Sequence, residues 1–366
     1  MIYLDHAATS LPRAPEALLA ALDAANWASP GRGMHSAQSA SRVAVQRARD
    51  DVRRLVGFGT VVFTAGCTAA LNMALHGLRP RPRVVAVDPM IHNAVRRPLA
   101  RLGARVWKLP SDLAGRVDPR AAERAWQAET ELVVLTHGSN VTGLLQPVAE
   151  LAEVAHRKSA RILVDAAQTA GLLCPLDVGE ADLVAFSAHK GLRALPGVGA
   201  LVVRDGVELD PLLSGGTGGE AVAVDMPAAL PERLEAGTPN LPGIAAMGAA
   251  AALTTTREPW PWRERARALR EAVRAAGLTP LGEGELPVVS CRVGHLTPTM
   301  AEEILDRVFG IVVRAGLHCA PAAHEHLGSG REGAVRFSVG PSTSDDDLAM
   351  LTQALRQLEG MEGGNS

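Results

Sequence analysis

Short apolar runs alternate with amphipathic stretches between about residue 60 and residue 205. Each run is apolar on both faces, which is typical of strands in a mostly parallel sheet that helices cover on both sides. The pattern predicts strands at 61–64, 83–87, 104–108, 131–135, 161–165, 183–187 and 198–203. It predicts helices between them at 67–77, 92–102, 119–128 and 147–158. In such an α/β fold, ligands bind outside the C-terminal ends of the strands.

The two ends of the chain have different patterns. Before the alternating region, 15–26 and 37–56 are predicted to be helical, joined by the stretch Ser29-Pro30-Gly31-Arg32-Gly33. After it comes an irregular, Gly- and Pro-rich segment at 208–240 and an Ala-rich segment at 243–256. The remaining residues predict, in order, a strand at 287–292, a helix at 298–308, strands at 310–314 and 333–338, a helix at 344–358 and a frayed tail at 360–366.

This organisation predicts a large domain with a mostly parallel central sheet, followed by a smaller α+β domain. We assign residues 15–245 to the large domain, and residues 1–14 and 246–366 to the small one. The last predicted helix has a clear start, because Ser342-Thr343-Ser344 precedes three aspartates. Hydroxyl side chains cap a helix N-terminus, and acidic residues favour its first turn.

Composition and charge place few further limits on the function of the protein. The net charge of −2 in 366 residues gives no reason to expect nucleic acid or a charged membrane surface as a partner. No apolar run reaches the roughly 18 residues needed to cross a bilayer, and the start of the chain lacks the pattern of a signal peptide. The four cysteines form no CxxC pair, which favours reduced thiols. We therefore predict a cytoplasmic protein.

A lysine stands out because the chain has only three of them, whereas arginine supplies nearly all the remaining positive charge. Lys190 lies in the stretch Phe186-Ser187-Ala188-His189-Lys190-Gly191, just past a predicted strand. Arginine cannot replace an amine that must lose its proton and form a Schiff base. A lysine kept where arginine is otherwise preferred is a candidate for covalent chemistry, although an exposed lysine is usually just solvated.

A carboxylate and an amide follow the preceding predicted strand. Asp165 ends a hydrophobic run, where a carboxylate needs a partner. An ionised acid opposite a pyridinium nitrogen would strengthen a pyridoxal phosphate ring as an electron sink, and Gln168 has the reach to hydrogen-bond a ring oxygen. The alternative is an ordinary helix N-cap at Asp165. The combination of Asp165, Gln168 and Lys190 favours the cofactor.

Anion binding is predicted where the first strand of this region meets its helix, at Thr64-Ala65-Gly66-Cys67-Thr68. Small residues there let backbone N–H groups approach an anion at the helix N-terminus. The stretch has no Walker A lysine, so a nucleoside triphosphate is not indicated. Ser187 and His189 are candidates for further phosphate donors.

A second candidate region is Arg314-Ala315-Gly316-Leu317-His318-Cys319-Ala320-Pro321. A loop thiol beside His318 is expected to have a lowered pKa, although cysteine is more often a buried small hydrophobe. A zinc site using His318, Cys319, His324 and His326 is too compressed for the usual structural arrangements, so we predict no metal. Arg336, on a predicted strand, is a candidate clamp for a substrate carboxylate, although most strand arginines face solvent.

These motifs together resemble the class V (fold-type I) pyridoxal phosphate enzymes and, within them, the cysteine desulfurase and selenocysteine lyase family. The resemblance extends from Tyr3-Leu4-Asp5-His6-Ala7-Ala8-Thr9 to Arg336-Phe337-Ser338. The Arg-x-Gly-x-His-Cys loop resembles the short cysteine loop of group II desulfurases. The stretch Glu235-Ala236-Gly237-Thr238-Pro239-Asn240 is similar to the segment that reaches the partner subunit's cofactor in that group.

The resemblance implies a set of cofactor residues. Lys190 would hold pyridoxal phosphate covalently, Asp165 would pair with the ring nitrogen, Gln168 would contact the ring hydroxyl, and His92 would stack on the ring. The phosphate would be bound by Thr68, Ser187 and His189, with Thr238 contributed by the other protomer of a homodimer. Cys67 stands beside the phosphate where the family usually has a hydroxyl residue. The sequence also departs from the usual family pattern at Ala69, His6 and Asn93.

The resemblance also implies the reaction. Asn140, Arg314 and Arg336 would hold the carboxylate of L-cysteine, and Cys319 would take its sulfur as a persulfide, leaving L-alanine. The persulfide would pass to an acceptor protein or a small thiol. The alternatives are a selenocysteine lyase acting on L-selenocysteine, another class V reaction such as transamination or kynureninase-like cleavage, and a protein that only binds the cofactor.

Overall fold

The computed structural model describes residues 1–31, 35–218 and 222–360. Its larger sheet has seven strands in the order β2-β8-β7-β6-β5-β3-β4. Only β8 is antiparallel to its neighbours, which confirms the mostly parallel sheet predicted from the sequence. The strands are β2 (Thr60–Thr64), β3 (Val84–Val87), β4 (Arg105–Lys108), β5 (Leu132–Thr136), β6 (Arg161–Asp165), β7 (Leu183–Ser187) and β8 (Gly199–Val203).

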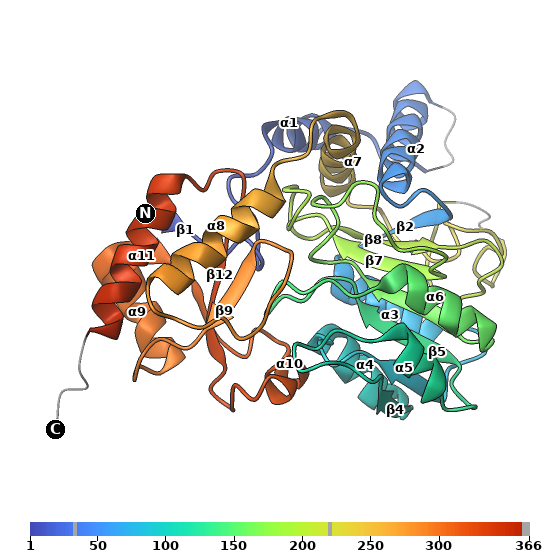
Figure 1. Cartoon of the computed structure of the whole chain (residues 1–366). Helices are drawn as coiled ribbons and strands as arrows, with labels where there is room; N and C mark the ends of the chain where they lie inside the picture. The colour runs from blue at the N-terminus through green and yellow to red at the C-terminus, as the bar shows by residue number, and fades with distance from the viewer. Residues whose placement is uncertain (32–34, 219–221, 361–366) are drawn as a thin grey trace.

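Helices cover both faces of this sheet (Figure 1). Alternate strand residues face two separate hydrophobic cores, since side chains on a strand point to opposite sides in turn. One core contains residues of α1 (Pro15–Ala24), α2 (Ser36–Val56), α5 (Pro119–Arg124), α6 (Val148–Arg157) and α7 (Leu241–Thr256). The other contains residues of α3 (Cys67–Gly77) and α4 (Asn93–Leu102). Burial on both faces explains why these strands are apolar throughout.

A second, smaller structure lies beside the large sheet (Figure 1). It contains a three-stranded sheet in the order β11-β12-β9 and the parallel pair β1-β10. One hydrophobic core joins most of these strands to three helices. The elements are β1 (Ile2–Tyr3), α8 (Trp262–Ala275), β9 (Val288–Cys291), α9 (Pro298–Phe309), β10 (Ile311–Val312), β11 (Arg314–Gly316), α10 (Pro321–His326), β12 (Ala334–Ser338) and α11 (Asp345–Glu359).

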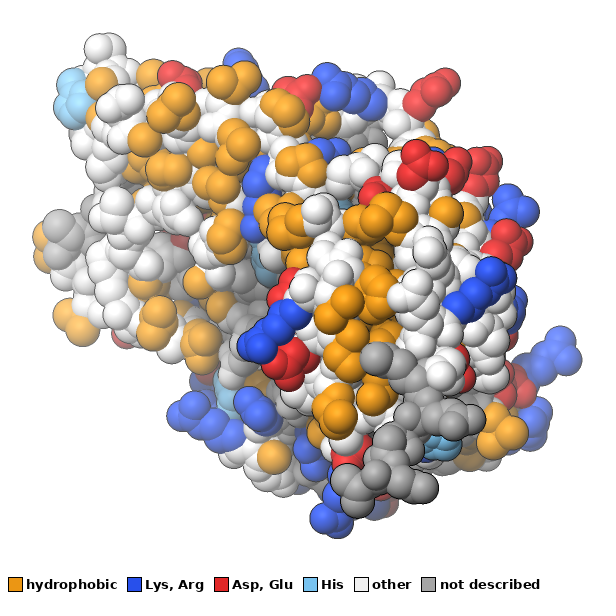
Figure 2. Space-filling model, turned by 90° about the vertical axis from the view of Figure 1, so that its left-hand side faces the viewer, with side chains coloured by type: hydrophobic (Ala, Val, Ile, Leu, Met, Phe, Trp, Pro, Cys, Tyr) orange, Lys and Arg blue, Asp and Glu red, His pale blue; other side chains and the backbone are white. Residues whose placement is uncertain are grey.

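The surface at this end of the molecule carries hydrophobic side chains and charged side chains of both signs (Figure 2). Within the described residues, no helix is long and apolar enough to cross a membrane.

Several elements differ from those predicted. Helix α5 ends at Arg124 rather than 128, because the chain turns so that Trp126 can pack edge-on against Trp107, with 6.1 Å between the ring centroids. The strand predicted at 310–314 is two short strands, β10 and β11, on different sheets. β1, α8 and α10 were not predicted. Arg32, Gly33 and residues 361–366 lie outside the described residues, and the predicted boundary at 245, which falls inside α7, stays a prediction.

The start of α11 confirms the sequence interpretation. Ser344 accepts a hydrogen bond from the backbone N–H of Asp347, whose carboxylate in turn accepts one from the backbone N–H of Ser344. This reciprocal arrangement satisfies two backbone donors at the helix N-terminus.

Gly199 controls how closely the β2–α3 turn can approach the sheet. A Cβ at this position would lie 2.6 Å from the carbonyl oxygen of Phe186 and 2.7 Å from the Cα of Gly66. We therefore expect Gly199→Ala to lower the free energy of unfolding by about 1–3 kcal/mol, measured by urea denaturation. The control is Gly216→Ala, since an added Cβ at Gly216 meets nothing within 4 Å. Equal stability of the two variants would contradict this.

Candidate active site

The predicted site residues converge at one edge of the large sheet. Thr64 and Ser187, at the ends of β2 and β7, both lie opposite Gly199 at the start of β8. Asp165 ends β6, the neighbour of β7. Lys190 follows three residues after Ser187. The C-terminal ends of parallel strands meet at the same edge, which is why motifs far apart in the sequence come together here.

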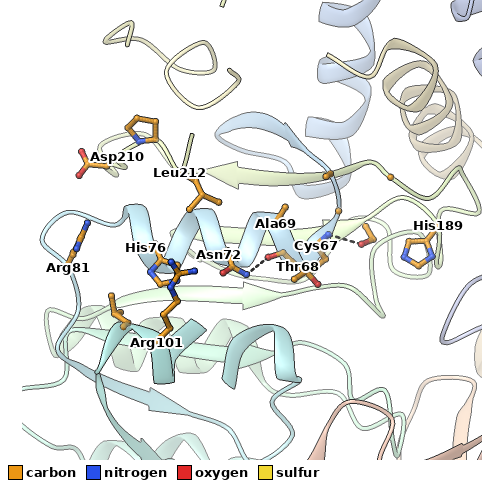
Figure 3. Close-up of a pocket in the computed structure, with 16 residues that line it drawn as sticks. Cys67, Thr68, Ala69, Asn72, His76, Arg81, Arg101, His189, Asp210 and Leu212 are labelled. Atoms are coloured by element: carbon orange, nitrogen blue, oxygen red, sulfur yellow. Dashed lines mark hydrogen bonds between the residues drawn. The ribbon is translucent and has the colours of Figure 1, made fainter. Parts of the chain in front are cut away.

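A cavity of about 920 Å³ opens at the N-terminus of α3 and continues along that helix. Figure 3 shows Cys67, Thr68 and His189 at one end of it, with Arg81 and Arg101 further along. The hydroxyl of Ser187 accepts a hydrogen bond of 2.8 Å from the backbone N–H of Cys67, and it keeps its own proton to donate. Helix N–H groups, two hydroxyls and an imidazole therefore form a cradle suited to an anion.

His189 is fixed by the N-terminal segment. Its Nδ1 lies 3.0 Å from the hydroxyl oxygen of Thr9. Its backbone carbonyl accepts hydrogen bonds from the side chain of Arg13 and the backbone N–H of Ser10. Burial, followed by the charges of Lys190 and Arg13, lowers the pKa of His189 to about 4. The ring is therefore neutral at physiological pH and can serve the cradle as a hydrogen-bonding group.

Asp165 is buried at the other side of this edge. Its Oδ1 accepts hydrogen bonds from the backbone N–H of Ala167, at 3.0 Å, and from the thiol of Cys67, at 3.4 Å. Burial, followed by the charge of Asp165, raises the pKa of Cys67 well above its usual value, so the thiol remains a donor. The side chain of Cys67 thus contacts Asp165, while its backbone N–H belongs to the cradle.

Lys190 and His92 lie within the electrostatic reach of Asp165. Burial lowers the pKa of Lys190, with Asp165 opposing the shift and Arg336 and Arg314 adding to it. Burial likewise lowers the pKa of His92, again opposed by Asp165. The Nδ1 of His92 accepts a hydrogen bond of 3.0 Å from the backbone N–H of Ala94, so the neutral ring carries its proton on Nε2.

Two residues predicted for the cofactor make other contacts. Gln168 is buried, and its Nε2 donates a hydrogen bond of 2.9 Å to the carbonyl of Ala7, which ties it to the N-terminal segment. Thr238 is exposed and lines a hollow beside the cradle with Glu235 and Arg49. It is not among the residues that line the cavity at α3.

Two arginines lie side by side on the small sheet. Arg314 on β11 pairs in register with Arg336 on β12. Arg336 is 2% exposed, and its guanidinium donates to Asp5 Oδ1 at 2.6 Å and to the carbonyl of Asn140 at 3.2 Å. Its Nε has no hydrogen-bond partner within the described residues. Like charges directly opposite each other on neighbouring strands are unfavourable. Because Asp5 is the only carboxylate in an ion pair with these two arginines among the described residues, the site favours binding a further anion.

The loop that carries Cys319 is held by two asparagines. The backbone N–H of Asn93 donates to the carbonyl of Cys319 at 2.7 Å. The Asn140 side-chain amide donates to the carbonyl of His318, also at 2.7 Å. His318 and Cys319 both have positive φ angles, of 49° and 57°, which residues other than glycine rarely adopt. Cys319 is exposed as a free thiol, and a thiolate at this position would raise the pKa of nearby Arg336.

His318 supplies no positive charge beside Cys319. Burial, followed by the positive charge of Arg336, lowers the pKa of His318 to about 2, so the ring is neutral and supplies no positive charge. Its ring lies 5.3 Å from that of His324, measured between centroids. Arg336 is instead the nearby cation. Within the described residues, no three His, Cys, Asp or Glu side chains gather to hold a metal ion.

Sequence reasoning missed the residues that support the site. Asp5 is the partner of Arg336, and Thr9 and Arg13 hold His189. Asp88, fully buried after β3, accepts hydrogen bonds from the backbone N–H groups of Met90 and Thr136. Burial raises the pKa of Asp88 to about 7. One local pattern could have indicated Asp5 and Asp88. Each is a carboxylate close to the end of an apolar strand, as Asp165 is.

Comparison with known proteins gives a consistent result. The family model described as aminotransferase class-V matches residues 2–351. The chain is 32% identical to a probable cysteine desulfurase of Methanothermobacter thermautotrophicus, over 98% of this chain and 95% of the relative. It is also 32% identical to a cysteine desulfurase of Cereibacter sphaeroides, over 97% and 94%. An apo cysteine desulfurase structure from Thermococcus onnurineus has a TM-score of 0.87 at 28% identity, covering 98% and 94%.

The ion pair between Asp5 and Arg336 leads to a stability prediction. Asp5→Asn would leave the buried guanidinium without its carboxylate, so we expect the free energy of unfolding to fall by about 3 kcal/mol in urea denaturation. The matched control is Glu303→Gln, which removes an exposed pair with Arg307. That change should cost about 0.5 kcal/mol or less. Similar losses in both variants would show that Arg336 is not buried as described.

The buried histidines predict how stability depends on pH. Burial lowers the pKa of four of them to about 4 and that of His318 to about 2, the four being His6, His137, His189 and His324. Between pH 6.5 and 4, the unfolded chain binds protons that the folded chain does not bind. The stability is therefore full above pH 6.5 and is lost as the pH falls towards 4.

The measurement is urea unfolding at a series of pH values. His137→Gln should flatten the pH dependence relative to the wild type, because His137 is 3% exposed. His295→Gln should leave the slope unchanged, because His295 is exposed. A stability that stays constant from pH 6.5 to 4 would contradict the burial of these rings.

Proposed function

The chain belongs to the aminotransferase class-V family, and on that premise we propose that it is a cysteine desulfurase that uses pyridoxal phosphate. The relatives and solved structures named cysteine desulfurase match nearly its whole length. In the proposed reaction, L-cysteine becomes L-alanine and its sulfur stays on Cys319 as a persulfide. The observation that carries the proposal is the exposed Cys319 thiol near half-buried Arg314 and buried Arg336 of the small sheet, whose charges also act on Lys190 at the edge of the large sheet.

The residues at the sheet edge fit the cofactor. Its phosphate suits the donors of the cradle, which are the N-terminal N–H groups of α3 with Thr68, Ser187 and His189. A protonated ring nitrogen would give buried Asp165 a cationic partner. Lys190 would hold the aldehyde, and Gln168 and His92 would contact the ring. When bound, pyridoxal phosphate supplies an electron sink that stabilises negative charge at the substrate Cα.

The protein side chains supply binding and proton transfer. Arg336 and Arg314 would bind the substrate carboxylate, with the unpartnered Nε of Arg336 as a donor ready for it. Asn140 would contribute by fixing Arg336 and the cysteine loop, since its backbone and side chain contact both. Because burial lowers the pKa of Lys190, more of its amine is neutral near pH 7, and its Nζ can take the proton from Cα.

The sulfur step uses Cys319. Its thiolate attacks the sulfur of the substrate, so that an S–S bond forms and the substrate Cβ–S bond breaks. The electron pair of the broken bond stays with the carbon fragment, which takes up protons and becomes L-alanine. The atoms and electrons balance without an external oxidant or reductant, and the product on the protein is the Cys319 persulfide.

We further propose that the active form is a homodimer in a reducing, cytoplasmic environment. Thr238 is exposed and does not line its own cradle, which supports a role in the cradle of a second subunit. The same segment exposes Leu213, Val222 and Val224 at 71%, 95% and 100%, which favours a contact surface. All four cysteines are free thiols, as expected for a reducing compartment.

The test measures alanine and sulfide from L-cysteine, with L-selenocysteine in parallel, under a reducing thiol. Wild type should release alanine and sulfide in equal amounts. Cys319→Ala should lose the cysteine reaction by on the order of 100-fold or more while still cleaving selenocysteine. The matched control is Cys174→Ala, since Cys174 is also an exposed free thiol. Full cysteine activity in Cys319→Ala, or no alanine from either substrate, would rule out the persulfide mechanism.

A further inference from the structure

A second pocket, of about 360 Å³, adjoins Cys319 on the side of α3 and α4. It is lined by Thr68, Asn72, His92, Arg97, Arg101 and Cys319 among others, and we call it the outer pocket. The residues proposed to bind the substrate carboxylate, Asn140, Arg314 and Arg336, are not among those that line it. Cys319 lines the outer pocket, and Asn140 connects the Cys319 loop to Arg336, since its side chain donates to the carbonyl of His318 and its own carbonyl accepts from Arg336. The outer pocket also adjoins the proposed cofactor residues, because Thr68 and His92 line it.

The charge of the outer pocket is one-sided. Arg97 and Arg101 lie one turn apart on α4, and both are exposed. Neither makes an ion pair with any residue that the structure describes, and the lining contains no acidic residue. Two like charges four residues apart destabilise a helix slightly. Arg101 lies in the last turn of α4, where the helix dipole favours a cation, but Arg97 lies outside that turn.

More positive charge lies where the outer pocket meets the α3 cavity. The two share Thr68, Asn72 and Arg101. Figure 3 shows Arg101 close to His76, with Arg81 further along the same cavity. Positive groups at a concave site raise the local concentration of anions. The volume of the outer pocket, about 360 Å³, is in the range of pockets that bind small molecules.

We infer that the outer pocket binds a small thiol that carries a carboxylate, and that this thiol takes the sulfur from Cys319. The inference rests on the proposed function, because it needs a persulfide on Cys319. Arg97 and Arg101 would hold the carboxylate and direct the acceptor thiol towards the sulfur. Cys319 would then receive sulfur from the substrate and deliver it to the acceptor in the outer pocket.

The transfer is balanced as written. The acceptor thiolate attacks the outer sulfur of the Cys319 persulfide, forming a new S–S bond. The S–S bond to Cys319 breaks, and Cys319 leaves as a thiolate that takes up the proton of the acceptor. One thiol and one persulfide react, and one thiol and one persulfide are formed, so no oxidant or reductant is consumed.

The test uses the cofactor-loaded enzyme in two stages. The enzyme is first loaded with L-cysteine, freed of excess substrate, and its alanine yield is measured. It then reacts with 3-mercaptopropionate, 2-mercaptoethanol or cysteamine, which are anionic, neutral and cationic, at equal thiolate concentrations. We expect the wild type to transfer sulfur roughly 5- to 10-fold faster to the anionic thiol than to the neutral one, as two exposed charges allow. Cysteamine should be slowest, and high salt should remove the differences.

Variants then assign the preference to the arginines. Arg97→Gln combined with Arg101→Gln should abolish the preference for 3-mercaptopropionate. The matched control is Arg96→Gln, since Arg96 is exposed on the same helix but does not line the outer pocket. This control should keep the full preference.

Each outcome decides a different question. No alanine in the first stage would refute the proposed function before any acceptor is added. Normal loading with no charge preference in the wild type, or a preference that survives salt and the double replacement, would overturn the inference about the outer pocket. In that case a protein acceptor, which reaches Cys319 without this pocket, would replace the small thiol.

Discussion

The contact between Asp5 and buried Arg336 joins parts of the chain that are far apart in the sequence. Asp5 follows the first strand, Arg336 lies on β12, and the carbonyl that Arg336 also contacts belongs to Asn140, after β5 of the large sheet. One guanidinium therefore connects the N-terminus, the small sheet and the large sheet. A buried charge tolerates little displacement from its partners, because losing them leaves it unsolvated. The relative position of the two sheets, and with it the shape of the substrate site, depends on this contact.

The N-terminal segment extends this connection to the cofactor side. Within nine residues of one another, Asp5, Ala7, Thr9 and Arg13 contact Arg336, Gln168 and His189. A short irregular stretch thus positions a group from each part of the site. The backbone and side chains of this segment, which has almost no regular secondary structure, thus serve as partners for polar groups that would otherwise be unsatisfied.

The large sheet and the central site residues could be predicted because their information is local. Apolar runs reveal the strands, and Asp165 ends one of them while Lys190 lies three residues after another. The contacts of Asp5 with Arg336, or of Asn140 with His318, join residues 331 and 178 positions apart and leave no local pattern. Burial keeps the ring of His318 neutral, and a sequence does not show that a loop histidine is enclosed. The contact of the Cys67 thiol with Asp165 could not be predicted either, because it depends on how α3 packs against β6 and β7.

The left-handed backbone at His318 and Cys319 has a consequence for the order of assembly. The loop does not adopt this shape by its own preference, so it depends on Asn93 and Asn140, which come from the other sheet. Lys190 and Asp165, by contrast, lie 25 positions apart within one continuous part of a single sheet. The lysine site can therefore form early, while the thiol reaches its place only after both sheets have docked. The position of Cys319 thus depends on the assembly of both parts of the chain, whereas Lys190 and Asp165 need only the large sheet.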